Sequence, residues 1–213
     1  MRYSAKDLIT RSSRQLVYFS NIPPSVERKK KAPTDWMKEG SDFQDYIYSY
    51  YFPSWYREMR GVVEINGNEV FFSNDICVED KFIEVKWLCE DSEVPKWYFE
   101  RSLFQCAVFK ALLKSCTILN TATFARKYIK YNTLRVSNDV EYYLWFGADV
   151  YQVDITSSKP FISFIEDKLD SLRNYNTATI FDSKYKFKEY ESFKSYIRYS
   201  KLSDEELNIL INK

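Results

Sequence analysis

The sequence predicts a mixed α/β domain in which a meander of three antiparallel strands is followed by a long helix and two further strands. The observations behind this prediction are an Asn-Gly pair between two apolar segments, a change from helical to strand periodicity near residue 60, and a return to helical spacing after Pro95. A chain of 213 residues is long enough for one domain with a real core and shorter than two ordinary domains need. We therefore expect a single domain over residues 1–213.

The segment before the strands contains a break and then a helix. Residues 1–35 are mixed, and Pro23-Pro24 interrupts any helix before a run of basic residues, so we expect a loop or short arm here. Apolar residues then recur at helical spacing up to Tyr51. The expected helix covers residues 41–51, with Ser41 as a plausible N-cap.

Short segments rich in Val, Ile and Phe predict the meander. Asn66-Gly67 and Glu79-Asp80 separate them, and Asn-Gly between apolar segments is the strongest short-range indication of a hairpin. The three strands are expected over residues 61–65, 70–78 and 81–88.

The rest of the chain alternates helical and strand patterns. Apolar residues at helical spacing predict a helix from Pro95 to Cys116, and Gly147-Ala148-Asp149 separates two further strand patterns. The full set of expected elements is helix 95–116, helix 123–131, strands 142–146 and 150–155, and helices 161–174, 187–198 and 203–211. The core is expected over about residues 36–155, with a helical extension over about 156–213.

Composition excludes several kinds of chemistry. The chain has no histidine, which removes Ser-His and Cys-His catalysis and imidazole-bound zinc. Its 31 basic and 30 acidic residues give a formal charge of +1, so any polyanion must be met by a local patch. Four cysteines without a C-x-x-C pair predict reduced, buried thiols. No signal-peptide core or membrane-length apolar run occurs, so we expect a soluble cytoplasmic protein without membrane contacts.

The second hairpin carries the candidate chemistry. If Glu79 and Asp80 form a two-residue turn, Val78 pairs with Lys81, and counting back along both strands places one acid opposite another. The acids are Asp75 and Glu84, with Cβ atoms roughly 5 Å apart. Lys86 follows two residues later and projects from the same face.

The opposite face of this hairpin is apolar, and its side chains can bury together. Its residues are Ile76, Val78, Ile83 and Val85. An odd-length turn would reverse the parity and separate the two acids. The alternative interpretation is an exposed hairpin face with an ordinary arrangement of charges.

Two carboxylates that face each other repel, and a divalent cation resolves the conflict. A histidine-free set of oxygen ligands favours Mg²⁺ or Mn²⁺, which suits phosphate chemistry. The ammonium group of Lys86 would orient the attacking water and offset charge on a phosphate.

The acid-x-Lys triplet is not specific by itself. It occurs five times, starting at residues 27, 79, 84, 166 and 182. Only Glu84-Val85-Lys86 lies on an apolar strand that is preceded by a strand with an acid at matching height and followed by a long helix.

This order of elements resembles the PD-(D/E)xK phosphodiesterase superfamily, in particular its RecB-like and lambda-exonuclease-like nucleases. The resemblance implies a restriction-endonuclease-like core with a central mixed sheet flanked by helices. Asp75 matches the acid of the second strand, and Glu84 with Lys86 matches the acid-x-Lys of the third. Gln105 matches the glutamine of a Gln-x-x-x-Tyr element, with Phe109 in place of tyrosine. The resemblance implies that Gln105 contacts the site or substrate.

The first helix departs from the RecB-like pattern. Those nucleases carry Gly-x-x-x-His, whose histidine is a metal ligand, and the corresponding residues here are Gly40 and Gln44. Other branches use an acid from this helix, so Asp45 or Asp42 would substitute. The implied metal ligands are thus Asp75, Glu84 and the Val85 carbonyl, with Gln44 or Asp45 added from the helix.

The resemblance implies a Mg²⁺- or Mn²⁺-dependent DNA nuclease of recombination, repair or phage DNA processing, without an iron–sulfur cluster. A homo-oligomer is possible, since lambda-like relatives form rings around DNA. One alternative is a catalytically inactive module on the same scaffold that binds nucleic acid or protein. A weaker one is a structural or inhibitory protein that binds another protein through its aromatic surface.

A basic run near the amino terminus is a candidate contact to DNA. Arg28, Lys29, Lys30 and Lys31 would clamp a phosphate backbone, and Trp36 would stack on a base. A solvated loop explains the same run without DNA.

Overall fold

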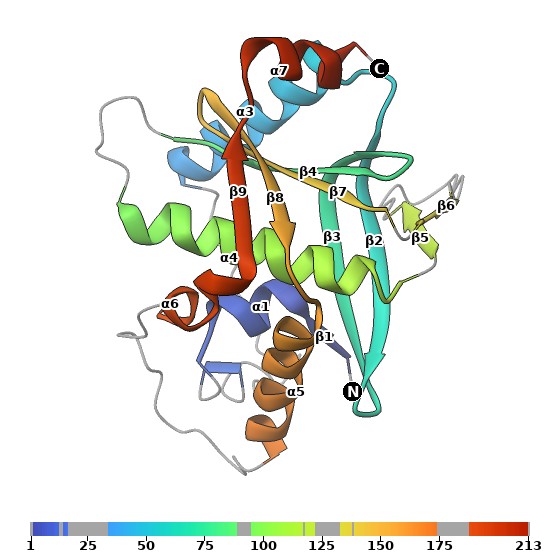
Figure 1. The fold of residues 1–213 in the computed structure, drawn as a ribbon, viewed down its shortest axis with the longest axis vertical. Coiled ribbons are helices and arrows are strands. Elements are labelled where there is room, and N and C mark those ends of the chain that lie inside the picture. The colour runs from blue at the N-terminus through green and yellow to red at the C-terminus, as the bar shows by residue number, and fades with distance from the viewer. Residues whose placement is uncertain are drawn as a thin grey trace.

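One mixed β-sheet runs through the part of the protein that the computed structural model describes, which is residues 2–12, 15–16, 34–88, 95–116, 118–121, 133–137, 139–173 and 188–212. The sheet has nine strands in the order β6-β5-β2-β3-β4-β7-β8-β9, with β1 beside β3 (Figure 1). Antiparallel pairing predominates, and the parallel pairs are β1 with β3 and β4 with β7. The fold is therefore mixed α/β, as predicted.

The strands are β1 (Arg2–Ser4), β2 (Tyr56–Ile65), β3 (Asn68–Val78), β4 (Lys81–Lys86), β5 (Ile118–Thr121), β6 (Thr133–Arg135), β7 (Glu141–Phe146), β8 (Asp149–Ile155) and β9 (Ile197–Lys201). The helices are α1 (Ala5–Thr10), α3 (Asp35–Tyr51), α4 (Lys96–Leu113), α5 (Lys159–Arg173), α6 (Glu189–Phe193), a short 3₁₀ turn (Lys194–Tyr196) and α7 (Asp204–Ile211).

Helices cover both faces of the sheet and form two apolar cores. On one face, α1, α4 and α5 pack against strand residues such as Phe82 and Leu144. On the other face, α3 and α7 pack against Ile83 and Val85. Figure 1 shows α3 and α7 at the top and α4 crossing the middle of the molecule. Strand side chains alternate between faces, so each central strand contributes to both cores.

Helix α4 is apolar nearly all round. Every residue from Ser102 to Leu113 is buried, because the helix lies between the sheet on one side and α1 and α5 on the other. Its register therefore decides which polar side chains are held inside the protein. Gln105 and Lys110 are two of these, and both are about 95% buried.

Strand β4 lies in the middle of the sheet, between β3 and β7. Phe82, Ile83, Glu84 and Val85 are all buried, which is typical of a strand covered on both faces. The alternative interpretation, an exposed hairpin face with an ordinary arrangement of charges, is therefore wrong, because α4 covers the face that carries Glu84.

Strand β3 is long, and two strands share one of its edges. Strand β1 pairs with residues 69–71 of β3, whereas β4 pairs with residues 76–78. Residues 72–75 lie between these two ladders, and this interval includes Asp75. The position of that residue is the basis of the site described below.

Both predicted turns are confirmed. Asn66 and Gly67 have φ values of 50° and 68°, which a two-residue hairpin turn of type I′ requires. Val78 pairs with Lys81 across Glu79-Asp80, as the register argument expects.

The structure corrects the sequence interpretation near both ends of the chain. Residues 2–10 form β1 and α1 rather than part of a loop or arm, and Ala5, Leu8 and Ile9 are fully buried. The predicted helix over 187–198 consists of α6 and the 3₁₀ turn followed by a strand, β9, at the sheet edge. The helix predicted over 123–131 lies outside the described residues.

Two further expectations bear on the site. Cys77, Cys106 and Cys116 are buried thiols, as predicted, and Cys89 lies outside the described residues. Within the described ranges, no helix combines the length and apolar character that crossing a membrane requires.

Candidate active site

The side chains of Lys86, from β4, and Gln105, from α4, both contact the carboxylate of Glu84. The Gln105 amide donates a hydrogen bond of 2.6 Å from Nε2 to Oε1 of Glu84, and Lys86 Nζ forms an ion pair with the same oxygen. Glu84 is only 3% exposed. Its second oxygen, Oε2, is buried and has no hydrogen-bond partner among the described residues. A buried carboxylate oxygen without a donor is costly unless a ligand satisfies it.

Asp75 joins this group from β3. The β3–β4 ladder ends at the pair Ile76–Ile83, so Asp75 and Glu84 are not ladder partners. Instead, Asp75 Oδ2 accepts a hydrogen bond of 2.8 Å from the backbone N–H of Val85. The carboxylate of Asp75 thus takes the place of a main-chain partner where β4 leaves β3.

The charges in the cluster perturb one another. Burial, followed by the negative charge of Glu84, raises the pKa of Asp75 to about 7, although Lys86 and the hydrogen bond from Val85 oppose the shift. Burial lowers the pKa of Lys86, but the charges of Glu84 and Asp75 outweigh burial and leave that pKa above its ordinary value. The ammonium group is therefore charged at neutral pH while Asp75 lies near its titration midpoint.

A local irregularity in β2 and β3 lies at Asn74 and Asp75. Asn74 and Cys77 both lie on the α4 side, which strict alternation forbids for residues three apart. The opposite strand carries Glu58 with φ of 52°, and the ladder between β2 and β3 omits the pair Glu58–Asp75. Such irregularities turn a side chain out of the ordinary pleat.

Asn74 and Tyr142 form a second buried polar pair beside Asp75. The Tyr142 hydroxyl donates to Asn74 Oδ1 at 3.0 Å, and both residues are fully buried. Burial, and then the charge of Glu84, raises the pKa of Tyr142 well above its ordinary value, which places the hydroxyl near the cluster. Sequence reasoning missed this pair, because ordinary alternation sends Asn74 and Asp75 to opposite faces.

Other predicted residues do not reach the cluster. Gln44 and Asp45 belong to α3, whose buried side chain Ile47 packs on the opposite face of the sheet. Asp45 forms an ion pair with Arg57, and Asp42 is exposed on the same helix. The predicted ligand set therefore loses its contribution from this helix, because α3 and α4 cover different faces.

The predicted nucleic-acid contacts are described only in part. Arg28, Lys29, Lys30 and Lys31 lie outside the described residues. Trp36 is the second residue of α3, and its side chain is not among those described.

The donors that remain fit a small, hard cation. Glu84 Oε2 and the Asp75 carboxylate are oxygen donors, and a residue's N–H and C=O share one strand edge, so the Val85 carbonyl faces the same edge as its N–H. Mg²⁺ and Mn²⁺ prefer oxygen ligands, and Mg²⁺ keeps several waters when few carboxylates are present. No group of three or more His, Cys, Asp or Glu that could hold a metal occurs within the described ranges, so water would complete the coordination.

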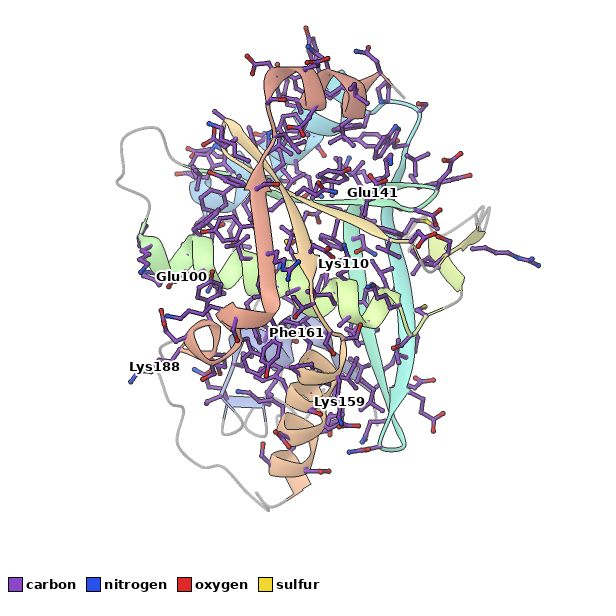
Figure 2. The ribbon with its side chains drawn as sticks, in the orientation of Figure 1. Glu100, Lys110, Glu141, Lys159, Phe161 and Lys188 are labelled. Atoms are coloured by element: carbon purple, nitrogen blue, oxygen red, sulfur yellow. The ribbon has the colours of Figure 1, made fainter. Side chains whose placement is uncertain are left out.

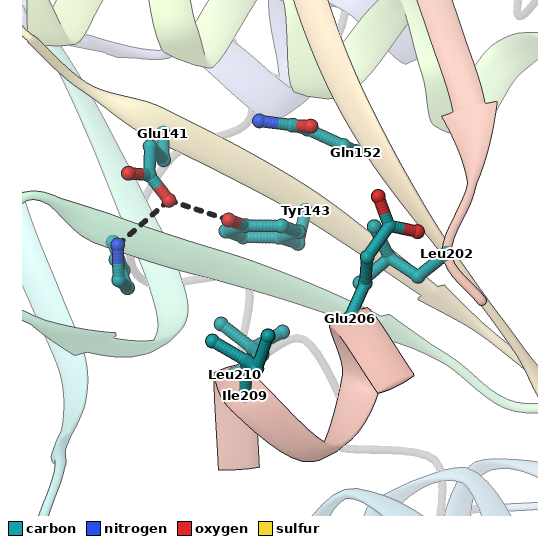
Figure 3. A pocket seen from close by; sticks show the side chains of 8 residues that line it. Glu141, Tyr143, Gln152, Leu202, Glu206, Ile209 and Leu210 are labelled. Atoms are coloured by element: carbon teal, nitrogen blue, oxygen red, sulfur yellow. Dashed lines mark hydrogen bonds and ion pairs between the residues drawn. The ribbon is translucent and has the colours of Figure 1, made fainter. Parts of the chain in front are cut away.

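A separate cavity of about 200 Å³ lies on the α7 side of the sheet (Figure 3). Its charged side chains pair with one another, since Glu141 accepts hydrogen bonds from Lys81 and from the Tyr143 hydroxyl. Glu206 at its rim accepts hydrogen bonds from Ser203 at the start of α7. Each of these interactions lies within the sheet or within the amino-terminal cap of α7, and we assign the cavity no chemistry.

Comparisons with known proteins give little further information. No protein-family model matches the chain, and no curated protein matches it. One solved structure, described as the crystal structure of SSO0001, is similar at 16% sequence identity over 79% of this chain and 75% of that chain, with a TM-score of 0.43. We base no conclusion on a likeness this distant.

Proposed function

We propose that the protein is a metal-dependent DNA nuclease that hydrolyses phosphodiester bonds with a metal-activated water. The observation that supports this proposal most strongly is the convergence of Asp75, Glu84, Lys86 and Gln105 on one buried site in which no described residue donates to Glu84 Oε2. These four residues are the ones that resemble the active-site pattern of PD-(D/E)xK nucleases.

Two carboxylates hold the cation in this proposal. Asp75 and Glu84 supply negative oxygens, and the Val85 carbonyl adds a neutral one. When bound, a divalent cation would acidify a water molecule and neutralise charge on the scissile phosphate. Gathering two acids in a buried place costs stability in the absence of a cation, and the raised pKa of Asp75 is the sign of that cost.

Lys86 and Gln105 position the reacting groups. Lys86 is cationic and its side chain is about 87% buried, so its charge is poorly screened and acts strongly on a nearby phosphate or water. Gln105 holds Glu84 Oε1 through a buried hydrogen bond of 2.6 Å, which fixes the orientation of the carboxylate. Its location on the rigid, buried helix α4 favours a fixed geometry.

The test is cleavage of linear and circular DNA with Mg²⁺ or Mn²⁺ by the wild type, Glu84→Gln and Lys86→Ala. We expect metal-dependent cleavage that both substitutions abolish. Glu166→Gln is a matched control, because Glu166-Asp167-Lys168 is the same acid-x-Lys triplet on α5, away from the sheet. Loss of activity in this control, or cleavage that survives Glu84→Gln, would contradict the proposal.

A catalytically inactive module is the second candidate function. The observation that favours it is the small ligand set: no third carboxylate joins Asp75 and Glu84 within the described ranges, and Lys86 and Gln105 already occupy Glu84 Oε1. A module of this kind would bind DNA equally well with or without EDTA. Its binding would also be unchanged by Glu84→Gln, and no metal would support cleavage.

A further inference from the structure

The first two turns of α4 present an aromatic and cationic surface. Trp97 is 50% exposed, although tryptophan is a residue that proteins ordinarily cover. The guanidinium carbon of Arg101 lies 5.0 Å from the centre of the Trp97 ring and 5.3 Å from that of Tyr98. We call Trp97, Tyr98 and Arg101 the aromatic platform. They share one helix face, because residues three and four apart are neighbours on a helix.

The cation of the platform, Arg101, makes no ion pair with a carboxylate in the part of the chain that the structure describes. The adjacent Glu100 pairs with Lys96 at 3.3 Å instead, and Figure 2 labels Glu100 near the amino-terminal end of α4. Burial lowers the pKa of Arg101, so its guanidinium has lost part of its water, and no carboxylate of the described residues supplies a counter-charge. A phosphate would supply that charge.

The platform lies next to the candidate active site. Tyr98 packs against Phe146 with ring centres 5.6 Å apart, and the residue after Phe146, Gly147, donates its N–H to the carbonyl of Lys86. Figure 1 shows the start of α4 on the same side of the molecule as the end of β4.

A mainly apolar cavity of about 420 Å³ is lined by Phe146, the ring that Tyr98 contacts. Phe99 and Tyr151 also line it, together with Leu88, Ala148 and Asp149, whose carboxylate pairs with Lys201. Phe99 is in contact with both other rings, at 5.0 Å between centres in each case. A chain of ring contacts therefore runs from the exposed Trp97 through Tyr98 to Phe146, which is buried and lines this cavity.

We propose that the aromatic platform and the adjoining cavity hold unpaired bases of a DNA strand whose backbone passes Lys86. This inference rests on the nuclease proposed above, and it specifies the substrate as single-stranded DNA or a frayed end. Stacking needs the flat face of a base, which a paired and stacked duplex does not offer. Arg101 and the positive amino end of α4 attract the accompanying phosphates.

The experiment measures binding separately from cleavage. Fluorescence anisotropy with a fluorescein-labelled 20-nucleotide oligo-dT in EDTA gives the dissociation constants of the full-length wild type, Trp97→Ala, Trp97→Phe and Arg101→Lys. Stacking of a base on an aromatic ring is worth about 1–3 kcal/mol, so Trp97→Ala should weaken binding about tenfold. Trp97→Phe keeps a ring and should lose less, and Arg101→Lys keeps the charge but loses the planar contact.

Matched controls identify what is bound. Tyr50→Ala removes an aromatic ring that is 68% exposed on α3, on the other side of the sheet, and should leave binding unchanged. An oligonucleotide of abasic sites should bind wild type and Trp97→Ala equally, because it has no bases to stack. A blunt duplex should bind the wild type more weakly than oligo-dT does. Three results would each overturn the inference. They are equal affinity of wild type and Trp97→Ala for oligo-dT, a loss of affinity for abasic DNA in Trp97→Ala as large as its loss for oligo-dT, and equal affinity of the wild type for duplex and oligo-dT.

The result also separates this inference from the nuclease proposal. If Trp97→Ala weakens binding but the wild type cleaves no DNA with any divalent cation, the platform stands and the nuclease proposal fails. If the wild type cleaves DNA and Trp97→Ala binds and cleaves like it, the platform alone is wrong. Circular dichroism spectra of all variants establish that each is folded.

Discussion

The Asp75 carboxylate and the Val85 backbone N–H form a hydrogen bond of 2.8 Å across the point where β3 and β4 diverge. Through this bond, a side chain on one strand is tied to the strand that carries the other acid and the lysine of the cluster. The backbone of β4 therefore fixes the position of the Asp75 carboxylate relative to Glu84, without a direct contact between the two side chains.

The stability of the metal-free protein should respond to the ionisation of Asp75. Its folded-state pKa of about 7 lies above the ordinary value of 3.8, so the folded state holds a proton that the unfolded state has lost. The contribution of this group to stability is therefore present below about pH 4 and is lost as pH rises to about 7. Asp75→Asn, which cannot ionise, should be more stable than wild type at pH 8.

Urea unfolding in EDTA at pH 5 and pH 8 checks this expectation. The gap between Asp75→Asn and wild type should be wider at pH 8 than at pH 5. A gap of the same size at both pH values would show that burial of the Asp75 charge is not what destabilises the site.

Metal binding should stabilise the protein through Glu84. A ligand that binds only the folded state adds about 2.7 kcal/mol to stability at a concentration of 100 times its Kd. Millimolar Mn²⁺ should therefore raise the Tm of the wild type, and Glu84→Gln should remove most of this increase, because Oε2 is then no longer an anionic donor. Thermal unfolding with and without Mn²⁺ measures the effect, with Glu166→Gln expected to respond like the wild type.

The Tyr142–Asn74 pair should be worth measurable stability. Tyr142→Phe leaves Asn74 Oδ1 buried without a donor, which costs about 1–3 kcal/mol. Urea denaturation gives the change in the free energy of unfolding. Tyr196→Phe is the control, since Tyr196 is 39% exposed, and this change should be close to neutral. A cost for Tyr142→Phe no larger than that of the control would mean that water reaches Asn74.

Two glycine substitutions should have opposite effects. A Cβ on Gly61 would lie against the Phe72 ring, 2.6 Å from its Cε1, and 2.8 Å from Leu119, so Gly61→Ala should destabilise the protein by about 1–3 kcal/mol. A Cβ on Gly40, inside α3, meets nothing nearer than 4.0 Å, so Gly40→Ala should stabilise by about 0.5–1 kcal/mol. Thermal unfolding of both variants checks the pair. Similar destabilisation by both changes would argue against the close packing of β2 on β3.

Much of the site follows from local sequence rules. The two-residue turn at Glu79-Asp80 sets the register, which places Glu84 and Lys86 on one face of β4. Helical spacing after Pro95 then brings Gln105 onto the face of α4 that contacts the sheet. Each of these steps depends on the nearest neighbours in sequence, where periodicity is informative.

The remainder depends on contacts that periodicity does not contain. The position of Asn74 on the α4 side follows from the irregularity near Glu58, a residue with positive φ that no sequence rule anticipates. Strand β9 has only Ile197 buried, because it lies at the sheet edge, so its apolar alternation is weak. Helix α1 has six residues, too few for a helical pattern to be recognised, and it is stabilised by burial of Leu8 and Ile9.

The parallel pairing of β4 with β7 determines when, during synthesis, the cluster around Glu84 can assemble. Lys81 and Glu141 are neighbours in the sheet although 60 residues separate them. During synthesis, the segment with Glu84 and Lys86 leaves the ribosome long before β7 does, and until then β4 has an unpaired edge. A nascent chain that stops short of Phe146 would thus carry every residue of the cluster without the surroundings that hold them together, and a truncated product should be inert toward DNA.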